Sequence, residues 1–335
     1  MIETSVRTIS AYPKRLGAII IGRNEGERLV TCLRSVSGKA TIVYVDSGSV
    51  DGSVAKARTF GADVVELDLS IPFTAARARN AGFARLLTIL PEVVYVQFLD
   101  GDCELVNGWL EAAVTFLDAE DGVAAVCGLL RERHPDRSVY NWLCDQEWKR
   151  PTGEILAFAG NVLLRADVLR AVGGYREDVI AAEEDELCVR IRRANWRIWR
   201  LPDEMALHDA SMVHFIQWWR RTRRAGYAFA QGADLHGSAP ERHFVRETRR
   251  AIAWALLLPL GLAIVSLRYP QIGWIFWLVY PMQLARLFFK AKGSMSDRMC
   301  LASFQILARF PEGIGVTQFW RDRLLGRRPR LIEHK

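Results

Sequence analysis

Two carboxylates at the end of an apolar run are the residues best suited to chemistry in this chain. Residues 93–99 are rich in β-branched and aromatic side chains, as in a buried strand, and Asp100, Gly101 and Asp102 follow directly. Two acids with a small residue between them can face one divalent cation, which can in turn bridge to a diphosphate. On its own the tripeptide is more often a polar turn, so this interpretation depends on the rest of the chain.

The first hundred residues alternate strand and helix patterns. This order is typical of an α/β protein with a mostly parallel sheet and helices on both of its faces. After Gly122 the pattern is looser, with a strand at 123–130, a loop and strand at 160–165 and a helix at 183–194. In the part of the chain before Gly122, we expect strands at 16–21, 41–45, 64–67 and 93–99, and helices at 24–36, 51–60 and 74–90.

Polar clusters follow three of the expected strands. They are Arg-Asn-Glu at 23–25, Asp-Ser-Gly-Ser at 46–49 and Asp-Gly-Asp at 100–102. Ligands of open α/β sheets bind at the carboxyl ends of the strands. The three clusters should therefore lie on one edge of the sheet, and this convergence favours a binding site over three unrelated turns.

A second acidic cluster begins the helix expected at 183–194. Its members are Glu183, Glu184, Asp185 and Glu186. Acids in a first turn complement the helix N-terminus by a few tenths to ~1 kcal/mol. Four in a row are more than this role needs, and neighbouring like charges raise the pKa of a carboxyl. The cluster is therefore a candidate for a general base.

The composition indicates which cellular compartment and which binding partners to expect. The chain has 335 residues and a net charge of +7, with its basic residues concentrated in the second half. A basic, Trp-rich second half fits an anionic membrane surface better than nucleic acid. The six cysteines form no CxxC pair, so we expect reduced thiols in the cytosol. Residues 1–14 contain no signal-peptide core, so no export is expected.

Two uncharged runs of 17 residues each, 251–267 and 269–285, are separated by Arg268. Each is at the short limit of a membrane-spanning helix, roughly 17–25 residues. The outer flanks are basic, which by the positive-inside rule places both in the cytoplasm. We expect a two-helix membrane hairpin. The alternative is a kinked hairpin lying in the interface, because Pro259 and Pro281 interrupt the runs.

Five segments together carry a family resemblance. They are Ile19–Glu25, the VDSGSVDGS segment at 45–53, the ARNAG segment at 78–82, Asp-Gly-Asp at 100–102, and Gly-Gly-Tyr at 173–175 followed by the acidic helix start. In this order and spacing they resemble glycosyltransferase family 2, inverting enzymes of the GT-A fold that use nucleotide-sugar donors. The resemblance covers about residues 16–225.

The resemblance implies roles for individual residues. Asp102, Asp100 and His208 would bind Mg²⁺ or Mn²⁺, and Glu184 would be the catalytic base. The implied nucleotide-binding residues are Arg23, Asn24, Glu25, Asp46, Ser47, Arg79 and Asp100.

Several positions depart from the family pattern. The base would be a glutamate where the family has aspartate, and Asp185 is the alternative if the alignment shifts by one. Ser47 stands where a second aspartate is common, which leaves the nucleobase open. His208 is equally compatible with an ordinary hydrogen-bonded histidine. Processive members carry QxxRW, whereas residues 217–221 read QWWRR. Together with only two candidate membrane helices, this favours transfer of a single sugar, and the two tryptophans fit interfacial anchors better than stacking platforms.

The leading functional hypothesis is transfer of one sugar from a UDP- or GDP-sugar to a lipid-linked saccharide. It would take place at the cytoplasmic face of the inner membrane, in polysaccharide (exopolysaccharide-type) synthesis, without nucleic acid. Two alternatives are a nucleotidyltransferase that makes nucleotide-sugars and a non-catalytic membrane scaffold of a polysaccharide assembly complex. The expected domains are a GT-A catalytic domain at 1–245 (donor half about 16–120, acceptor half about 121–245), the hairpin at 246–292 and a basic amphipathic tail at 293–335.

Overall fold

The computed structural model describes residues 15–327 and separates them into two compact units. The first contains the chain up to Asp178 and residues 183–211, and the second contains residues 179–182 and everything from Met212 onward. The helix that follows Met212 thus belongs to the second unit, although the sequence suggested a catalytic domain up to 245. The expectations for residues 1–14 and for the last residues of the tail, 328–335, lie outside the described residues.

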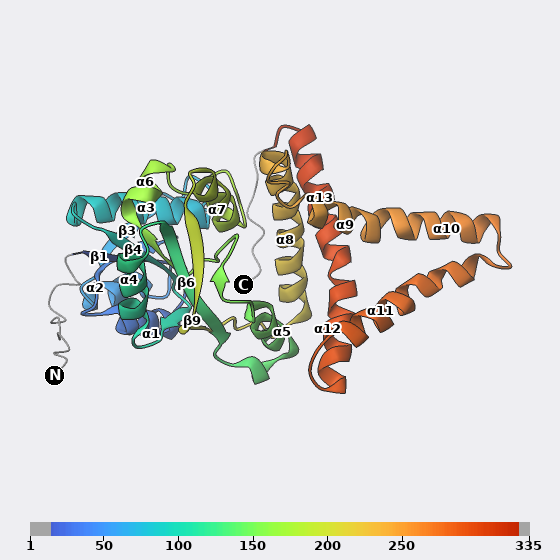
Figure 1. The fold of residues 1–335 in the computed structure, drawn as a ribbon, viewed down its shortest axis with the longest axis horizontal. Coiled ribbons are helices and arrows are strands. Elements are labelled where there is room, and N and C mark those ends of the chain that lie inside the picture. The colour runs from blue at the N-terminus through green and yellow to red at the C-terminus, as the bar shows by residue number, and fades with distance from the viewer. Residues whose placement is uncertain (1–14, 328–335) are drawn as a thin grey trace. The chain divides into compact units, whose positions relative to one another are not determined.

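A nine-stranded mixed sheet forms the centre of the first unit, in the order β3-β2-β1-β4-β8-β6-β9-β5 with β7 beside β9 (Figure 1). β1, β2, β3 and β4 are parallel, whereas β8 is antiparallel to both β4 and β6. The strands are β1 (Leu16–Gly22), β2 (Thr41–Asp46), β3 (Asp63–Glu66), β4 (Tyr95–Asp100), β5 (Cys103–Leu105), β6 (Val123–Glu132), β7 (Gly153–Glu154), β8 (Val162–Arg165) and β9 (Arg197–His208).

The parallel strands end together, as the sequence predicted. Gly22 of β1 pairs with Asp46 of β2, and Ile21 pairs with Asp100 of β4. Successive strand residues point to opposite faces, and β1 is buried without interruption from Leu16 to Ile20. Both faces of the sheet are therefore covered, and its exposed functional groups are confined to the strand ends.

Helices of the first unit are α1 (Glu27–Val36), α2 (Ser53–Thr59), α3 (Ala75–Ile89), α4 (Trp109–Ala119), α5 (Val139–Trp148), α6 (Ala166–Ala171) and α7 (Glu183–Arg193), with a short 3₁₀ turn at Pro135–Arg137. α3 begins where Thr74 accepts a hydrogen bond from the backbone N–H of Arg77. At Gly82, an added Cβ would lie 2.5 Å from Ile19 and 2.9 Å from Val45. This glycine lets α3 approach the sheet closely, which brings the residues at its start to the strand ends.

The sequence did not predict β9, a twelve-residue strand that runs parallel to β6 through several irregularities. Its pattern alternates poorly, because Pro202, Asp203 and Glu204 interrupt the apolar residues. Its antiparallel partners β5 and β7, together with β8, make the mostly parallel sheet a mixed one. β9 ends at His208, which thereby reaches the same region as the residues after β4.

The second unit is helical. It consists of α8 (Phe215–His236), α9 (Val245–Ile252), a π-helical turn η3 (Ala253–Leu257), α10 (Leu258–Arg268), a 3₁₀ helix η4 (Gly273–Leu278), α11 (Val279–Lys290), α12 (Met295–Leu307) and α13 (Arg309–Leu324). α8 and α13 cross at two glycines. An added Cβ would lie 2.0 Å from the Glu312 carbonyl oxygen at Gly226, and 2.1 Å from that of Arg223 at Gly315. α13 is thus part of the unit's core.

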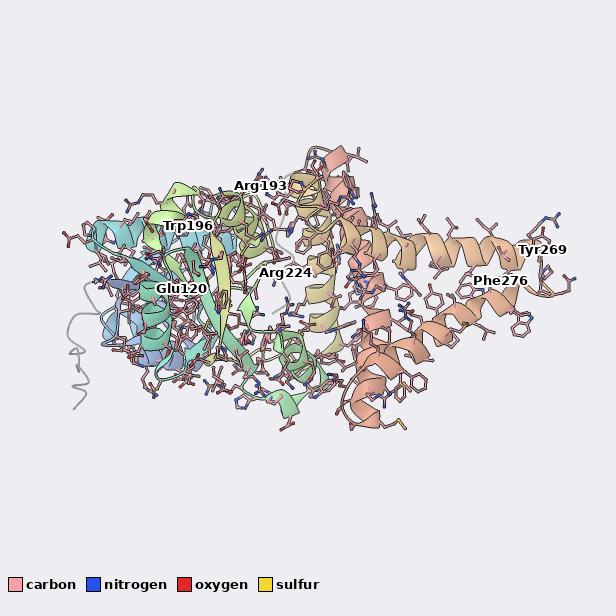
Figure 2. The ribbon with its side chains drawn as sticks, viewed as in Figure 1. Glu120, Arg193, Trp196, Arg224, Tyr269 and Phe276 are labelled. Carbon is pink, nitrogen blue, oxygen red and sulfur yellow. The ribbon has the colours of Figure 1, made fainter. Side chains whose placement is uncertain are left out.

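The expected hairpin is present, as α9, η3 and α10 on one arm and η4 with α11 on the other (Figure 1). The first arm continues past Pro259 because the π-helical turn just before it accommodates the missing N–H. Tyr269 and Phe276 lie at its tip, both about half exposed (Figure 2).

Within the range the structure describes, one helix is long enough and apolar enough to cross a membrane. It is the first arm of the hairpin, Val245–Arg268. Only 11% of its most apolar stretch is buried. The second arm is divided, with Pro281 in the first turn of α11, where proline is tolerated.

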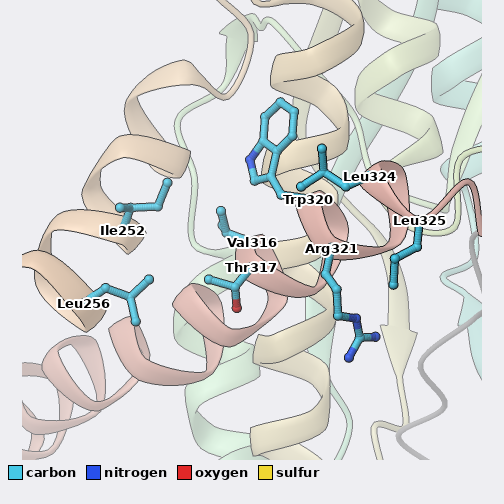
Figure 3. Close-up of a pocket in the computed structure, with 8 residues that line it drawn as sticks. All are labelled: Ile252, Leu256, Val316, Thr317, Trp320, Arg321, Leu324 and Leu325. Atoms are coloured by element: carbon cyan, nitrogen blue, oxygen red, sulfur yellow. The ribbon is translucent and has the colours of Figure 1, made fainter.

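Three further features of the second unit correct or extend the sequence analysis. Trp218 is 4% exposed and packs edge-on against Phe304, so it is a core residue and not an interfacial anchor. Gln217 accepts hydrogen bonds from the start of α8, as a helix cap. An apolar groove of about 420 Å³ lies between the first arm and α13, lined by Ile252, Leu256, Val316, Thr317, Trp320, Arg321, Leu324 and Leu325 (Figure 3).

Candidate active site

The loops after β1 and β2 hold each other in place. The backbone N–H of Asn24 donates to Ser49 Oγ at 2.9 Å, and Asn24 Oδ1 accepts from the N–H of Val50 at 2.8 Å. Asp51 Oδ2 accepts from the N–H of Gly26 at 2.9 Å. Two of the motifs that follow parallel strands therefore form one interlocked edge.

Asp46 shapes this edge from inside. Its carboxylate is buried and accepts from Tyr44 Oη at 3.0 Å and from the N–H groups of Gly48 and Ser49 at 2.9 and 2.8 Å. Ser47 is also buried, and its N–H donates to the Gly22 carbonyl. Asp46 thus fixes the loop through backbone donors.

Two other predicted residues border the same edge. The Arg23 guanidinium lies over the Phe73 ring, 5.2 Å from its centroid. Glu25 is buried, and Arg28 forms an ion pair with it at 2.6 Å. Its side chain fills the space beside Gly101, where an added Cβ would lie 3.2 Å from Glu25 Cγ. A side chain at position 101 would thus require Glu25 to shift by a few tenths of an ångström.

Arg79 is the centre of the site's charge arrangement. The residue is 2% exposed, and its guanidinium contacts Asp100 at 3.0 Å, Glu183 at 2.7 Å and Glu184 at 2.9 Å. It also lies over the Tyr175 ring, 5.4 Å from the centroid. One arginine of α3 thereby joins the end of β4 to the start of α7, two regions over eighty residues apart in the sequence.

The neighbouring Asn80 attaches the Gly-Gly-Tyr segment. Its side-chain amide donates to the Tyr175 carbonyl and accepts from the Tyr175 N–H, both at 2.8 Å. Gly174 has a left-handed backbone with φ +70°, and an added Cβ there would lie 2.8 Å from Asn80 Oδ1. The ARNAG and Gly-Gly-Tyr motifs are thus in direct contact and place the start of α7 against Arg79.

Two acids at the start of α7 have altered proton affinities. Burial raises the pKa of Glu184 to about 8; Glu183 adds to the rise, whereas Arg79 opposes it. Burial also raises the pKa of Asp185 to about 7, with Arg150 opposing. Both carboxyls suit proton transfer near neutral pH. Of the two, Glu184 is the one that contacts Arg79.

A possible metal position lies where β4 and β9 end. His208 Nε2 is 3.6 Å from Asp102 Oδ1, and the potential ligand atoms of Asp102, Cys103 and His208 lie within 4.8 Å of one another. Burial raises the pKa of the Cys103 thiol well above its usual value, so the thiol stays protonated. The Asp102 carboxylate suits Mn²⁺ or Mg²⁺, and of these two ions the softer Mn²⁺ accepts an imidazole nitrogen more readily, so the residues present fit Mn²⁺ better than Mg²⁺.

Asp100, predicted as a second metal ligand, is held by Arg79 and lies outside this group. Its backbone N–H donates to Asn161 Oδ1 at 2.9 Å, and Asn161 Nδ2 donates to Cys103 Sγ at 3.2 Å. At Gly160 an added Cβ would lie 2.5 Å from Asp100 Oδ2. Gly160 and Asn161 were identified from the sequence only as a loop, yet they border Asp100, and Asn161 also binds Cys103.

The Nδ1 atom of His208 contacts a residue that the sequence did not indicate. Glu132 Oε2 lies 3.2 Å from His208 Nδ1, and the Trp148 ring packs edge-on against the imidazole at 4.8 Å. Burial disfavours the protonated ring, but Asp102 and Glu132 outweigh it and raise the pKa of His208. No short-range sequence signal links Glu132 to His208, because the pairing of β6 with β9 creates the contact.

The chain is similar to known glycosyltransferases in sequence and in fold. Residues 18–168 match the sequence profile of glycosyl transferase family 2. The chain is 24% identical over 243 residues to the glycosyltransferase AglE of Haloferax volcanii, an alignment covering 68% of each protein.

The structure of this chain is similar to that of the mannosyltransferase PcManGT of Pyrobaculum calidifontis, solved with GDP-mannose and Mn²⁺. The TM-score is 0.60 at 19% identity, over 90% of this chain and 87% of the other. This likeness confirms the predicted α/β GT-A fold followed by a C-terminal helical region.

The buried arginine yields a stability prediction. Arg79→Met leaves Asp100, Glu183 and Glu184 without their shared cation, and breaking a buried ion pair typically costs about 3–5 kcal/mol. A carboxyl whose folded pKa is raised destabilises the fold as pH rises above its unfolded pKa. Removing Arg79 raises the pKa of Glu184 further, so the loss should be small near pH 5 and grow toward pH 8.

Arg85→Met is the matched control, because Arg85 lies on the same helix and pairs with Asp63 at the surface. That exposed pair should contribute less than about 1 kcal/mol at either pH. Urea unfolding at the two pH values measures both effects. Equal losses for the two variants would show that the Arg79 ion pairs do not support the fold.

Proposed function

We propose that this chain, which carries a family 2 glycosyltransferase domain and is a glycosyltransferase, transfers one sugar with inversion to a lipid-linked saccharide at the cytoplasmic face of a membrane. The observation that carries the proposal is the meeting of a metal-suited pair, Asp102 and His208, with a base of raised pKa, Glu184, on one sheet edge. Arg79 links the two through Asp100.

The chemistry divides between these residues. A nucleoside diphosphate leaves poorly until its charge is neutralised, and a divalent ion bound by Asp102 and His208 would supply that neutralisation. Glu184 would accept the proton of the acceptor hydroxyl as that oxygen attacks the anomeric carbon from the opposite side. Arg79 keeps Glu184 oriented and partly ionised in a buried position.

The donor is proposed to be a UDP- or GDP-sugar. The interlocked loops at 23–26 and 47–51 follow the carboxyl ends of β1 and β2, where open α/β sheets bind ligands, and the similar mannosyltransferase was solved with GDP-mannose and Mn²⁺. Asp46 directs its carboxylate to its own loop, so we expect base recognition to rest on loop backbone groups.

Membrane association is proposed from the hairpin. Its side chains include a dense set of exposed apolar residues, among them Leu257, Leu260, Ile264, Leu267, Trp274, Met282 and Phe289. Such a surface in water would be a large unfavourable patch. Basic residues before and after the hairpin support a cytoplasmic location of both ends and a role in polysaccharide synthesis at the inner membrane.

The nucleotidyltransferase alternative is less well supported. Enzymes of that kind need a basic, glycine-rich loop after the first strand to hold a triphosphate. Here the loop contains Glu25, which is buried in an ion pair with Arg28. The non-catalytic scaffold alternative gives no reason for a buried glutamate with a pKa of about 8 beside an arginine.

The proposed function is tested first by donor binding. In calorimetry with UDP, GDP, CDP and dTDP, one nucleotide should bind in the presence of Mn²⁺, and Asp102→Ala should abolish the metal-dependent part of that affinity without unfolding. The corresponding sugar nucleotide should then be consumed with membrane-extracted acceptors. Pyrophosphate release from a nucleoside triphosphate and a sugar phosphate would instead identify a nucleotidyltransferase.

The base is tested by two neighbouring substitutions. Glu184→Gln should slow turnover about 10²–10⁴-fold with donor affinity unchanged, because the amide cannot accept the proton. Turnover of the unaltered chain should rise with pH through about 8, as Glu184 loses its proton, and the variant should lack this rise. Asp185→Asn is the control and should stay active. The reverse result would assign the base to Asp185, and activity in both would reject the mechanism.

Membrane association is tested with charge substitutions at the hairpin. Leu260→Lys with Ile264→Lys, two residues more than half exposed on α10, should release the protein from liposomes in flotation. Each lysine costs about 2.5–3.5 kcal/mol at the centre of a membrane helix. Leu69→Lys with Ile71→Lys adds the same charge at similarly exposed positions of the first unit, and should still float. Flotation of both variants would contradict the proposed insertion.

A further inference from the structure

We propose that Glu132 is a positioning residue that fixes the imidazole of His208 in the tautomer whose free Nε2 faces Asp102. The inference deepens the proposed function and rests on it, because it assigns His208 as the nitrogen ligand of the divalent ion. Glu132 is the last residue of β6, and His208, the last residue of β9, is its direct neighbour across the parallel pair.

Glu132 is held rigidly on all sides. Its side chain is fully buried, and its carboxylate accepts from Asn141 Nδ2 at 3.2 Å and from the N–H of Ala210 at 3.2 Å. The N–H of His134 contributes a longer bond at 3.4 Å. With these donors in place, the carboxylate cannot turn away from His208 Nδ1.

The tautomer follows from the chemistry of the partner. An ionised carboxylate only accepts hydrogen bonds, so a neutral His208 must carry its proton on Nδ1 to pair with Glu132. Nε2 then presents its lone pair on the side where Asp102 Oδ1 lies 3.6 Å away. A carboxylate behind a metal-binding histidine commonly fixes its orientation and strengthens its basicity.

A purely structural role would produce a different environment. Asp145, for example, is a buried carboxylate on α5 whose negative charge is neutralised by two cations, Arg131 at 3.0 Å and Lys149 at 2.9 Å. Among residues 15–327, the ion pair formed by Glu132 is with His208 instead. The position of this carboxylate is thus accounted for by the histidine that it orients.

Glu132→Gln is the decisive substitution. The glutamine amide has nearly the same shape but can donate to Nδ1, which would move the imidazole proton to Nε2 and block the ligand atom. Mn²⁺ affinity, measured by electron paramagnetic resonance on the full chain, should fall about 10- to 100-fold. Glu312→Gln is the matched control, since it makes the same change at a buried glutamate of the second unit that pairs with Arg309, and it should change affinity less than about twofold.

A double-mutant cycle separates positioning from general damage. In a His208→Ala background, Glu132→Gln should have no further effect on Mn²⁺ affinity, because the residue acts only through the imidazole. Equal losses with and without His208 would overturn the inference. So would wild-type Mn²⁺ affinity in a folded Glu132→Gln protein.

A metal-free measurement keeps the inference testable even if the variant does not fold or the chain binds no Mn²⁺. The ¹⁵N shifts of His208 in the unaltered protein, assigned by their loss in His208→Ala and recorded where the ring is neutral, should show a protonated Nδ1 and a bare Nε2. A protonated Nε2 would refute the positioning role. Absent Mn²⁺ binding with the expected tautomer would instead count against the proposed function alone.

Discussion

Arg79 brings one positive charge into a site that holds three carboxylates. Its guanidinium is buried, and Asp100, Glu183 and Glu184 all lie within 3.0 Å of it. Unpaired buried charges are costly, so the structure around Arg79 must keep all four groups together. That requirement explains the close approach of α3 to the sheet at Gly82 and the lack of room for a side chain at Gly160. Both glycines serve the placement of one arginine.

The same constraint separates the functions of the acids. Because Arg79 occupies Asp100, Glu183 and Glu184, the carboxylate that faces Nε2 of His208 is that of Asp102. Burial then keeps the proton affinity of Glu184 high, against the pull of Arg79. A cation and a proton acceptor can thus work on one sheet edge without competing for the same oxygen atoms. The proposed metal assistance and the proposed base catalysis therefore involve different strand and helix ends.

Local patterns in the sequence were enough for the parallel half of the fold. The clusters at 23–25, 46–49 and 100–102, each of which follows a strand, share one edge of the sheet as predicted. This arrangement could be predicted because alternation and turn residues are short-range signals. The family resemblance placed Arg79 near the nucleotide, but its partners come from pairings across the chain. Glu132 and β9 were missed for the same reason. Trp218 was misassigned because burial by Phe304 depends on helix packing.

The position of a bound Mn²⁺ tests this division of the acids most directly. Crystals of the full chain soaked with Mn²⁺ and a nucleoside diphosphate would locate the ion by its anomalous scattering. One peak within coordination distance of Asp102 and His208 Nε2, with the Arg79 ion pairs to Glu183 and Glu184 intact, is the predicted result. A peak among the acids at 183–186, with Arg79 displaced, would contradict the account, because the largest acidic cluster would then be the metal site.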